Sequence, residues 1–264
     1  MTIDTYTLHR GTSPLLISFP HVGTEIPGDQ QVRYTQRALA SEDTDWFLDR
    51  VYSFAAGLGA TLIVPRFSRY LIDLNRSSDN APMYPGQNNT ELVPTRHFSG
   101  DELYRANLAP DDIEIERRIL HYWHPYHDAL RTELAQIRRA HGHAVLFDAH
   151  SIKSELPWLF DGRLPHMSIG TASGGSCAAS LRDAVTRVFA AQSDFSHVVD
   201  ARFKGGHITR HFGQPNDGVH AVQLEMCWRA YMNEDPPYEW NEARAGVVTP
   251  LLVRFVETLI RWVP

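Results

Sequence analysis

The hydrophobic positions of this chain form two kinds of pattern, short apolar runs and longer stretches with helical spacing. Each apolar run is short enough for a buried strand and is followed by a proline or a polar residue. The predicted strands are residues 14–19, 60–64, 70–74, 144–147 and 219–224. The predicted helices are residues 41–54, 111–140, 176–191 and 240–262. Pro125 is expected to break or kink the second helix, and Gly142 follows its end.

The alternation of strands with helices predicts an α/β architecture. We expect a single domain over residues 1–264, with a mixed, mostly parallel sheet and helices on both faces. In open sheets of this kind the functional site lies beyond the carboxyl ends of the strands. Polar residues stand at four such ends, namely His21, Asn75 with Arg76, His150 and Glu225. The sequence therefore predicts one site at one edge of the sheet.

Composition and charge exclude several classes of protein. The chain has 264 residues, 43% of them hydrophobic, which is enough for a sizeable core. Its 31 acidic residues exceed its 25 basic ones, so we expect no nucleic acid partner. No apolar run approaches the ~18 residues of a membrane span and no targeting pattern is visible, so we expect a cytoplasmic protein without a membrane partner. The oligomeric state is left open.

Residues 77–100 form a long stretch with neither a helical nor a strand pattern. They are rich in Asn, Pro, Ser and Gly. Loops of this length are uncommon in compact domains and are often functional. We therefore expect an active-site loop here, with a plain surface loop as the alternative.

Two histidines at strand ends indicate a metal site. A catalytic zinc ion takes about three nitrogen or oxygen ligands and keeps one open position. His21 and His150 each follow an apolar run and have small neighbours, which leaves room for an ion. A carboxylate from the predicted helix start completes the set, with Asp43 preferred to Asp45. Asp148 projects to the same side of its strand as His150, and it either orients an imidazole or is itself a ligand.

Longer blocks of the sequence resemble a known family. They are SFPHVGTEIP (18–27), SEDTDWFLDRVY (41–52), SRYLIDLNR (68–76), LFDAHSI (146–152), FKGGHITRHFG (203–213) and QLEMCWRAYM (223–232). These blocks resemble the signature blocks of N-formylglutamate deformylases, in the same order and over nearly the whole chain. That family resembles zinc carboxypeptidases and aspartoacylases, with a phosphorylase/hydrolase-like fold. The resemblance thus implies a mixed sheet with helices on both sides and a metal site at the strand ends.

The resemblance also implies an activity and roles for particular residues. It implies that one zinc ion per chain, with another divalent metal as the alternative, supports hydrolysis of N-formyl-L-glutamate to formate and L-glutamate, a reaction of histidine degradation. His21 and His150 match the two imidazole ligands, and Glu225 matches the glutamate that deprotonates the attacking water.

The carboxylate ligand stays open among three residues. Zinc carboxypeptidases place it three positions after the first histidine, where this chain has Thr24. The candidates are therefore Asp43, Asp45 and Glu25.

The expected substrate, a small N-acyl amino acid, carries two carboxylates. Planar guanidinium groups bind carboxylates through paired, charge-assisted hydrogen bonds. Arg76, with Asn75 beside it, matches the Asn-Arg pair that holds a substrate carboxylate in such enzymes, and Arg210 is the candidate for the second carboxylate. Arg69 and Lys204 are reserve cations.

Two other functions are compatible with the sequence. Cys177, near the predicted start of a helix, could act as the nucleophile of an amidase if its pKa were lowered. The polar strand ends could also bind an acidic metabolite without turnover. Glu225 argues against simple binding, because a carboxylate repels an anionic ligand, whereas a metal hydrolase needs a proton acceptor.

Overall fold

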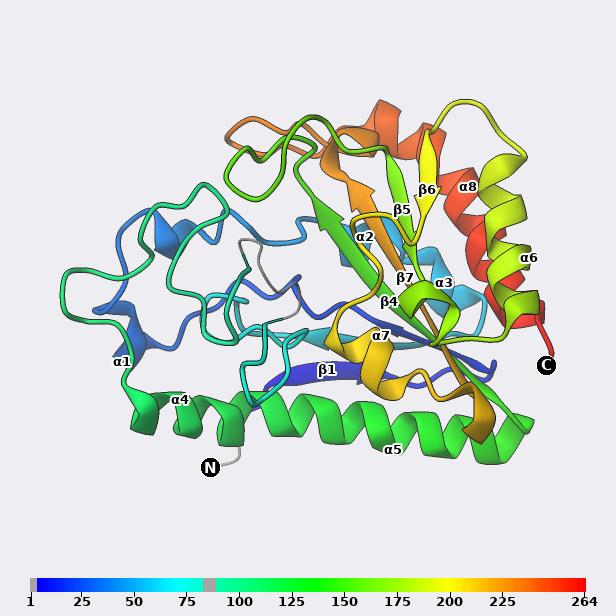
Figure 1. Ribbon diagram of the computed structural model, residues 1–264, viewed down its shortest axis with the longest axis horizontal. Helices are drawn as coiled ribbons and strands as arrows, with labels where there is room; N and C mark the ends of the chain where they lie inside the picture. The colour runs from blue at the N-terminus through cyan, green and yellow to red at the C-terminus, as the bar shows by residue number, and fades with distance from the viewer. Residues whose placement is uncertain (1–3, 83–88) are drawn as a thin grey trace.

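The structure, a computed structural model, describes residues 4–82 and 89–264. Its strands are β1 (Tyr6–His9), β2 (Leu15–Ser18), β3 (Thr61–Pro65), β4 (Ala144–Ile152), β5 (Met167–Gly170), β6 (His197–Val199) and β7 (Val219–Cys227). Within the described ranges these seven strands form one sheet in the order β1-β3-β2-β4-β7-β5-β6 (Figure 1). The four central strands are parallel, whereas β1 and β5 join them antiparallel and β6 is parallel to β5. The predicted mixed, mostly parallel sheet is therefore confirmed.

The helices connect the strands and surround the sheet. The α-helices are α1 (Gly28–Gln31), α2 (Leu48–Val51), α3 (Phe54–Gly57), α4 (Asp112–Arg118), α5 (His124–His141), α6 (Ala179–Ala190), α7 (His207–Phe212) and α8 (Glu242–Arg261). Short 3-10 turns are η1 (Ala38–Ala40), η3 (Ala172–Gly174), η4 (Pro215–Asp217) and η5 (Trp228–Ala230), and η2 (Ile119–Trp123) is a π-helical turn. Among the described residues, no helix combines the length and the apolar character required to cross a membrane.

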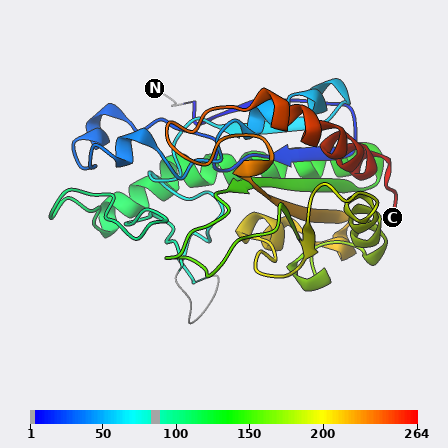
Figure 2. The same cartoon turned by 90° about the horizontal axis from the view of Figure 1, so that it is seen from above.

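Helices cover both faces of the sheet, as predicted. Val145 and Phe147 of β4 pack with α2, α3, α6 and α8, whereas Ala144 and Leu146 pack with α5 and α7. This division follows from the alternation of side chains along a strand. Figure 2 shows α8 (red) and α7 (gold) on opposite sides of the strands.

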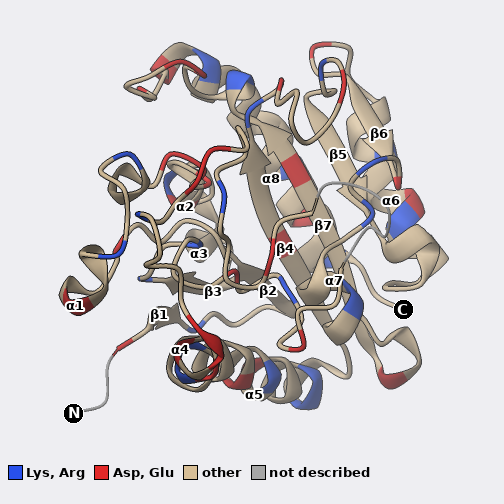
Figure 3. Cartoon of the chain, turned by 60° about the vertical axis from the view of Figure 1, so that its left-hand side comes forward, with Lys and Arg blue, Asp and Glu red and all other residues tan. Residues whose placement is uncertain are grey.

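The face that packs on α5 and α7 becomes polar towards the carboxyl ends of the strands. Asp148 and His150 follow Leu146 on that side of β4, and His150 pairs with Glu225 of β7. Figure 3 shows red segments on the central strands around β4 and β7, in a sheet that is otherwise mostly tan. The carboxyl edge of the sheet therefore carries the polar residues, as the sequence predicted.

Most of the predicted elements are present. Residues 14–19, 60–64, 144–147 and 219–224 correspond to β2, β3, β4 and β7, and residues 176–191 and 240–262 correspond to α6 and α8. β4 and β7 extend further than predicted, so that His150 and Glu225 lie within their strands. The outer strands β1, β5 and β6, of three or four residues, were not predicted; β2 is as short, but it lies within the longer apolar run 14–19.

Two predicted elements are wrong. Residues 70–74 form turns instead of a strand, and side chains of other elements bind their carbonyls. The helix predicted to begin at Ser41 is replaced by turns and the short helices α2 and α3, because Ser41 and Phe47 adopt positive φ angles of 51° and 58°. Asp43 and Asp45 consequently lie in turns ahead of α2.

The predicted helix 111–140 continues through Pro125 without a break. Just before Pro125, it changes from α-helical to π-helical winding for one turn. α4, the π-turn η2 and α5 follow one another without a gap. Pro125 stands in the first turn of α5, where the missing N–H of proline is best tolerated. Gly142 ends the helix with a φ of 81°, a left-handed conformation that glycine adopts readily.

Candidate active site

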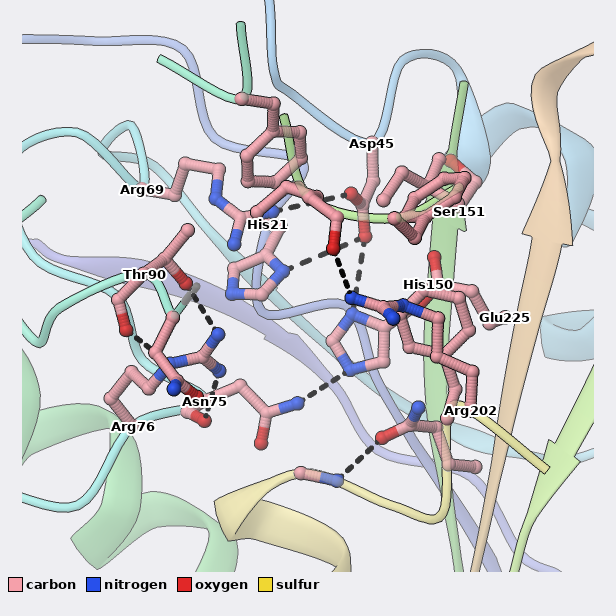
Figure 4. A pocket seen from close by; sticks show the side chains of 18 residues that line it. His21, Asp45, Arg69, Asn75, Arg76, Thr90, His150, Ser151, Arg202 and Glu225 are labelled. Atoms are coloured by element: carbon pink, nitrogen blue, oxygen red, sulfur yellow. Dashed lines mark hydrogen bonds and ion pairs between the residues drawn. The ribbon is translucent and has the colours of Figure 1, made fainter. Parts of the chain in front are cut away.

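Three buried side chains meet at the carboxyl edge of the sheet. His21 follows β2, Asp45 lies in the turn before α2, and His150 lies in β4. Their exposed fractions are 3%, 1% and 4%, and one ligand atom from each lies within 4.8 Å of the others. Figure 4 shows both imidazole rings turned towards the Asp45 carboxylate. The backbone N–H of Asp45 donates to the His21 carbonyl at 3.0 Å, which fixes this turn against the end of β2.

The Nδ1 atoms of the two histidines face the same carboxylate oxygen. Oδ2 of Asp45 is 3.8 Å from Nδ1 of His21 and 3.3 Å from Nδ1 of His150. The opposite nitrogen of each ring has its own carboxylate, because Nε2 of His21 is 2.6 Å from Asp73 and Nε2 of His150 is 3.2 Å from Asp148. Carboxylates in this position orient an imidazole and leave its other nitrogen available for a metal.

The donor set fits a divalent metal ion. Two imidazoles and one carboxylate are a ligand set that catalytic zinc uses. Burial alone would lower the pKa of His150, but Asp148 and Asp45 outweigh burial and raise that pKa well above its usual range. Burial and the charge of Arg69 lower the pKa of His21, which favours the neutral ring, the form that binds a metal ion.

Glu225 completes the catalytic candidates. It lies in β7 opposite His150 and lines the same pocket. Burial raises the pKa of Glu225 to about 8, against the opposing effect of His150. A carboxyl group whose pKa is close to neutral is suited to accept and return a proton.

Three arginines line the same pocket. Arg69 donates to Asp73 at 2.8 Å, lies 3.9 Å from the Asp45 carboxylate and covers the ring of Phe98. Arg76 is held by the backbone carbonyl and the hydroxyl of Thr90.

Arg202 donates to a backbone carbonyl, that of Leu159, and its guanidinium lies 5.0 Å from the centre of the Phe160 ring. In Figure 4, Arg76 approaches from the side of Thr90 and Arg202 from the side of Glu225. The pocket thus offers cations on two sides of the histidines.

One wall of the pocket is apolar. Its residues belong to a small hydrophobic cluster and come from the segment between β3 and α4, from the end of β4 with the loop after it, and from the loop after β6; they are Phe98, Ile152, Leu159, Phe160 and Phe203. The side chains of this wall form no hydrogen bonds with a ligand. The charged groups on the other sides of the pocket therefore determine which ligands bind.

The structure places Asp45, and not the preferred Asp43, beside the two histidines. The Asp43 carboxylate accepts hydrogen bonds from the Tyr70 hydroxyl at 2.7 Å and from the Phe98 backbone N–H at 2.8 Å. Glu25 is also separate from the histidines, since its half-exposed side chain pairs with Arg66 at 2.8 Å. Of the three candidates Asp43, Asp45 and Glu25, Asp45 is the one whose carboxylate lies beside both histidines.

Two of the predicted substrate-binding cations lie elsewhere. Arg210 is exposed in the last turn of α7 and donates to the Gly205 carbonyl at 2.8 Å, and Lys204 is exposed on the loop before α7. Neither lines the pocket, whereas Arg202, Phe203 and Gly206 of the segment before α7 do.

Asn75 lines the pocket, but its amide is used within the protein. Its Oδ1 accepts from the Ile208 backbone N–H at 2.8 Å. Its Nδ2 lies 3.2 Å from Asp148 and 2.7 Å from Nε2 of His150. The side chain packs so closely on Gly206 that a Cβ atom there would lie 2.2 Å from it. Asn75 therefore positions His150, and the predicted contact with a substrate carboxylate falls to Arg76 alone.

Sequence reasoning missed Asp73 and Arg202. Asp73 is fully buried and binds both His21 and Arg69. The missed signal was its position two residues before Asn75, within one of the family blocks. Arg202 stands just before another of those blocks, but charge alone did not distinguish it from Lys204 and Arg210.

The predicted active-site loop, residues 77–100, is described in part. Residues 83–88 lie outside the described residues. Asn89, Thr90 and Phe98 from the remainder line the pocket.

The predicted alternative nucleophile is not at this pocket. Cys177 is 3% exposed and belongs to the core that packs on α6 and α8. Burial raises its pKa to about 11, which is the opposite of what a reactive thiol requires.

The chain is similar to known proteins over most of its length. Residues 13–232 match the model of the N-formylglutamate amidohydrolase family. The N-formylglutamate deformylase of Pseudomonas aeruginosa is 43% identical over 259 residues, covering 98% of this chain and 97% of that protein. The N-formylglutamate deformylase of Pseudomonas putida is 41% identical over 256 residues, covering 97% and 96%.

Solved structures show the same fold. N-formylglutamate amidohydrolase from Ralstonia eutropha JMP134 superposes with a TM-score of 0.83 at 24% identity, covering 99% of this chain and 100% of that one. A gene product from Agrobacterium tumefaciens gives a TM-score of 0.72 at 18% identity, covering 98% and 95%. Since the family model spans residues 13–232 and both Pseudomonas proteins align nearly end to end, this chain belongs to the N-formylglutamate amidohydrolase family.

Proposed function

We propose that this protein hydrolyses N-formyl-L-glutamate to formate and L-glutamate, using one zinc ion held by His21, Asp45 and His150. The observation that carries the proposal is the buried group of two imidazoles and one carboxylate, with Glu225 beside it in a pocket lined by arginines. Two Pseudomonas proteins that are 43% and 41% identical bear the name N-formylglutamate deformylase, which supports the choice of substrate.

The metal and the protein have separate tasks. A bound divalent ion polarises the substrate carbonyl and lowers the pKa of water. Asp73 accepts from Nε2 of His21 at 2.6 Å and so keeps Nδ1 of that ring directed at the ion site, while Asp148 and the Asn75 amide hold Nε2 of His150. Arg69, 3.9 Å from Asp45, is placed to stabilise negative charge that develops on the reacting carbonyl oxygen.

Glu225 moves the proton. Water adds to the formyl carbon while Glu225 accepts one of its protons. The carbon–nitrogen bond then breaks, and Glu225 delivers that proton to the departing glutamate nitrogen. One carboxyl group thus serves first as a base and then as an acid.

The two carboxylates of the substrate bind to two arginines. Arg76 and Arg202 line the pocket from different sides, so a dianion can contact both. Guanidinium groups give each carboxylate a paired, charge-assisted contact. Arg202 replaces Arg210 in this role, because Arg210 is exposed outside the pocket.

The other candidate functions lack such support. A cysteine amidase would need a reactive thiol at the pocket, but Cys177 is buried elsewhere and its pKa is raised to about 11. Simple binding of an acidic metabolite would give Glu225 no role, because binding without turnover needs no group that accepts and returns a proton. A role in histidine degradation and a cytoplasmic location accompany the proposed activity and remain predictions.

Formate release tests the proposal. Protein of measured metal content is given N-formyl-L-glutamate, and N-acetyl-L-glutamate and N-formyl-L-aspartate measure its specificity. We expect release of formate, loss of activity on chelation and recovery on addition of zinc. Absence of formate from zinc-loaded protein would refute the proposed substrate, whereas full activity without bound metal would refute the proposed zinc site.

A further inference from the structure

Residues 71–76 carry part of the candidate site without belonging to a strand. They include Asp73, Asn75 and Arg76, and they run through the interior as turns. Buried carbonyls outside a sheet need partners of another kind, since an unpaired buried carbonyl is costly. The positions of these side chains therefore depend on whatever binds that backbone.

One helical segment supplies three of these partners. Arg118 donates to the Leu71 carbonyl at 2.9 Å, and Nε2 of His127 lies 2.8 Å from the Leu74 carbonyl. The indole N–H of Trp123 donates to the carbonyl of Arg76 itself at 2.9 Å. The three donors are thus spread along the backbone that they hold.

The spacing of these donors requires the π-turn. Arg118 and His127 are nine positions apart, which at about 100° per residue places them on opposite faces of a regular α-helix. A π-turn adds roughly one residue to the helix and turns the following part back by about 100°. η2 therefore brings Arg118, Trp123 and His127 onto the same side, facing residues 71–76.

The donor closest to Arg76 is firmly fixed. The Trp123 ring stacks on the His127 ring with centroids 3.6 Å apart and planes 13° apart. Trp123 is 6% exposed and His127 is fully buried. A rigid indole thus sets the position of the backbone from which the Arg76 side chain extends.

We propose that Trp123, placed by the π-turn η2, is a positioning residue that sets Arg76 for one carboxylate of the substrate. The proposal rests on the proposed function, and it assigns to Trp123 a role in substrate selection. Trp123 does not touch the substrate. It acts through the Arg76 carbonyl, so its loss should weaken recognition of the carboxylate that Arg76 binds and leave the bond-breaking step unchanged.

The test is Trp123→Phe, which keeps the stacked ring and removes the indole N–H. We expect its KM for N-formyl-L-glutamate to rise roughly three- to tenfold, the range that one neutral hydrogen bond supports, with kcat within about twofold of wild type. The matched control is Trp262→Phe. Trp262 is also buried, and its N–H donates to Ser180 at 3.1 Å, at the opposite end of β4 and β7.

Two analogues separate positioning from general loosening. N-formyl-L-glutamine lacks the side-chain carboxylate, and N-formyl-4-aminobutyrate lacks the α-carboxylate. One of the two analogues lacks the carboxylate that Arg76 binds. Trp123→Phe should leave KM for that analogue unchanged, and so should Arg76→Lys. His127→Phe, which keeps the stack and loses the bond to the Leu74 carbonyl, provides a second variant and should give the same selectivity.

Two results would overturn the inference. One is an equal loss on all three substrates, and the other is a change in Trp123→Phe no larger than that in Trp262→Phe. Failure of the proposed function looks different, because wild-type protein would then release no formate from N-formyl-L-glutamate.

Discussion

Replacement of Asp73 by asparagine should weaken metal binding although Asp73 does not contact the ion site. Its carboxylate accepts from His21 at 2.6 Å, from Arg69 at 2.8 Å and from the backbone N–H of Asn75 at 2.9 Å. All three neighbours are donors. An asparagine amide has only one acceptor oxygen, so either orientation of Asp73→Asn brings its NH2 group against a donor.

The two orientations differ in their effect on His21. If the amide oxygen faces His21, the NH2 group opposes the Arg69 guanidinium. If the NH2 group faces His21, it donates to Nε2 and drives the ring proton onto Nδ1, the nitrogen directed at Asp45. Loss of such an orienting carboxylate typically weakens metal binding about 10- to 100-fold, which corresponds to roughly 1.4–2.7 kcal/mol.

Zinc affinity is measured by competition with a chromophoric chelator on metal-free protein. Asp73→Asn should show a 10- to 100-fold higher Kd for zinc, and its formate release should recover largely at saturating zinc. Asp128→Asn is the control for loss of one carboxylate, because Asp128 lies exposed on α5 and pairs with Arg131. An unchanged zinc Kd in Asp73→Asn, together with a lowered melting temperature, would show that Asp73 is only structural.

Three further predictions concern single side chains. Glu225→Gln should retain zinc and KM but lose about 10²–10⁴ in kcat, and a kcat within tenfold of wild type would remove Glu225 from the mechanism. Arg202→Gln should raise KM and reduce the penalty for removing one substrate carboxylate, whereas Arg210→Gln should match wild type; equal effects would contradict the assignment of Arg202. Cys177→Ala should keep kcat/KM within about threefold, because a thiol with a pKa of about 11 is almost fully protonated at neutral pH. Rapid inactivation by iodoacetamide that this variant prevents would revive the cysteine alternative.

The edge of the sheet could be predicted from the sequence because its signal is local. A buried strand followed by a histidine needs only the apolar run and the residue after it, as in Leu15–Ser18 and His21. The same reasoning found His150 and Glu225, although the sequence did not show that their two strands are neighbours in the sheet. Only the strand ends were misplaced, because β4 and β7 continue past the predicted ends and include His150 and Glu225.

The segment 70–76 could not be predicted in this way. Its apolar run YLIDL has the pattern of a strand, yet its carbonyls bind to Arg118, His127 and Trp123. These partners come from a helix more than forty positions later in the chain, and a rare π-turn aligns them. Local periodicity carries no information about such partners, so both the turn and the role of Asp73 were missed.

The choice between Asp43 and Asp45 shows the same limit at the scale of two residues. Both carboxylates are buried, and no sequence rule separates them. The Asp45 N–H binds the His21 carbonyl, which places the Asp45 carboxylate beside the imidazoles. The Asp43 carboxylate instead holds the backbone of Phe98, whose ring lies 4.7 Å from the Arg69 guanidinium. One short acidic turn therefore serves two parts of the pocket, since Asp45 faces the ion site and Asp43 fixes the aromatic wall over the arginine.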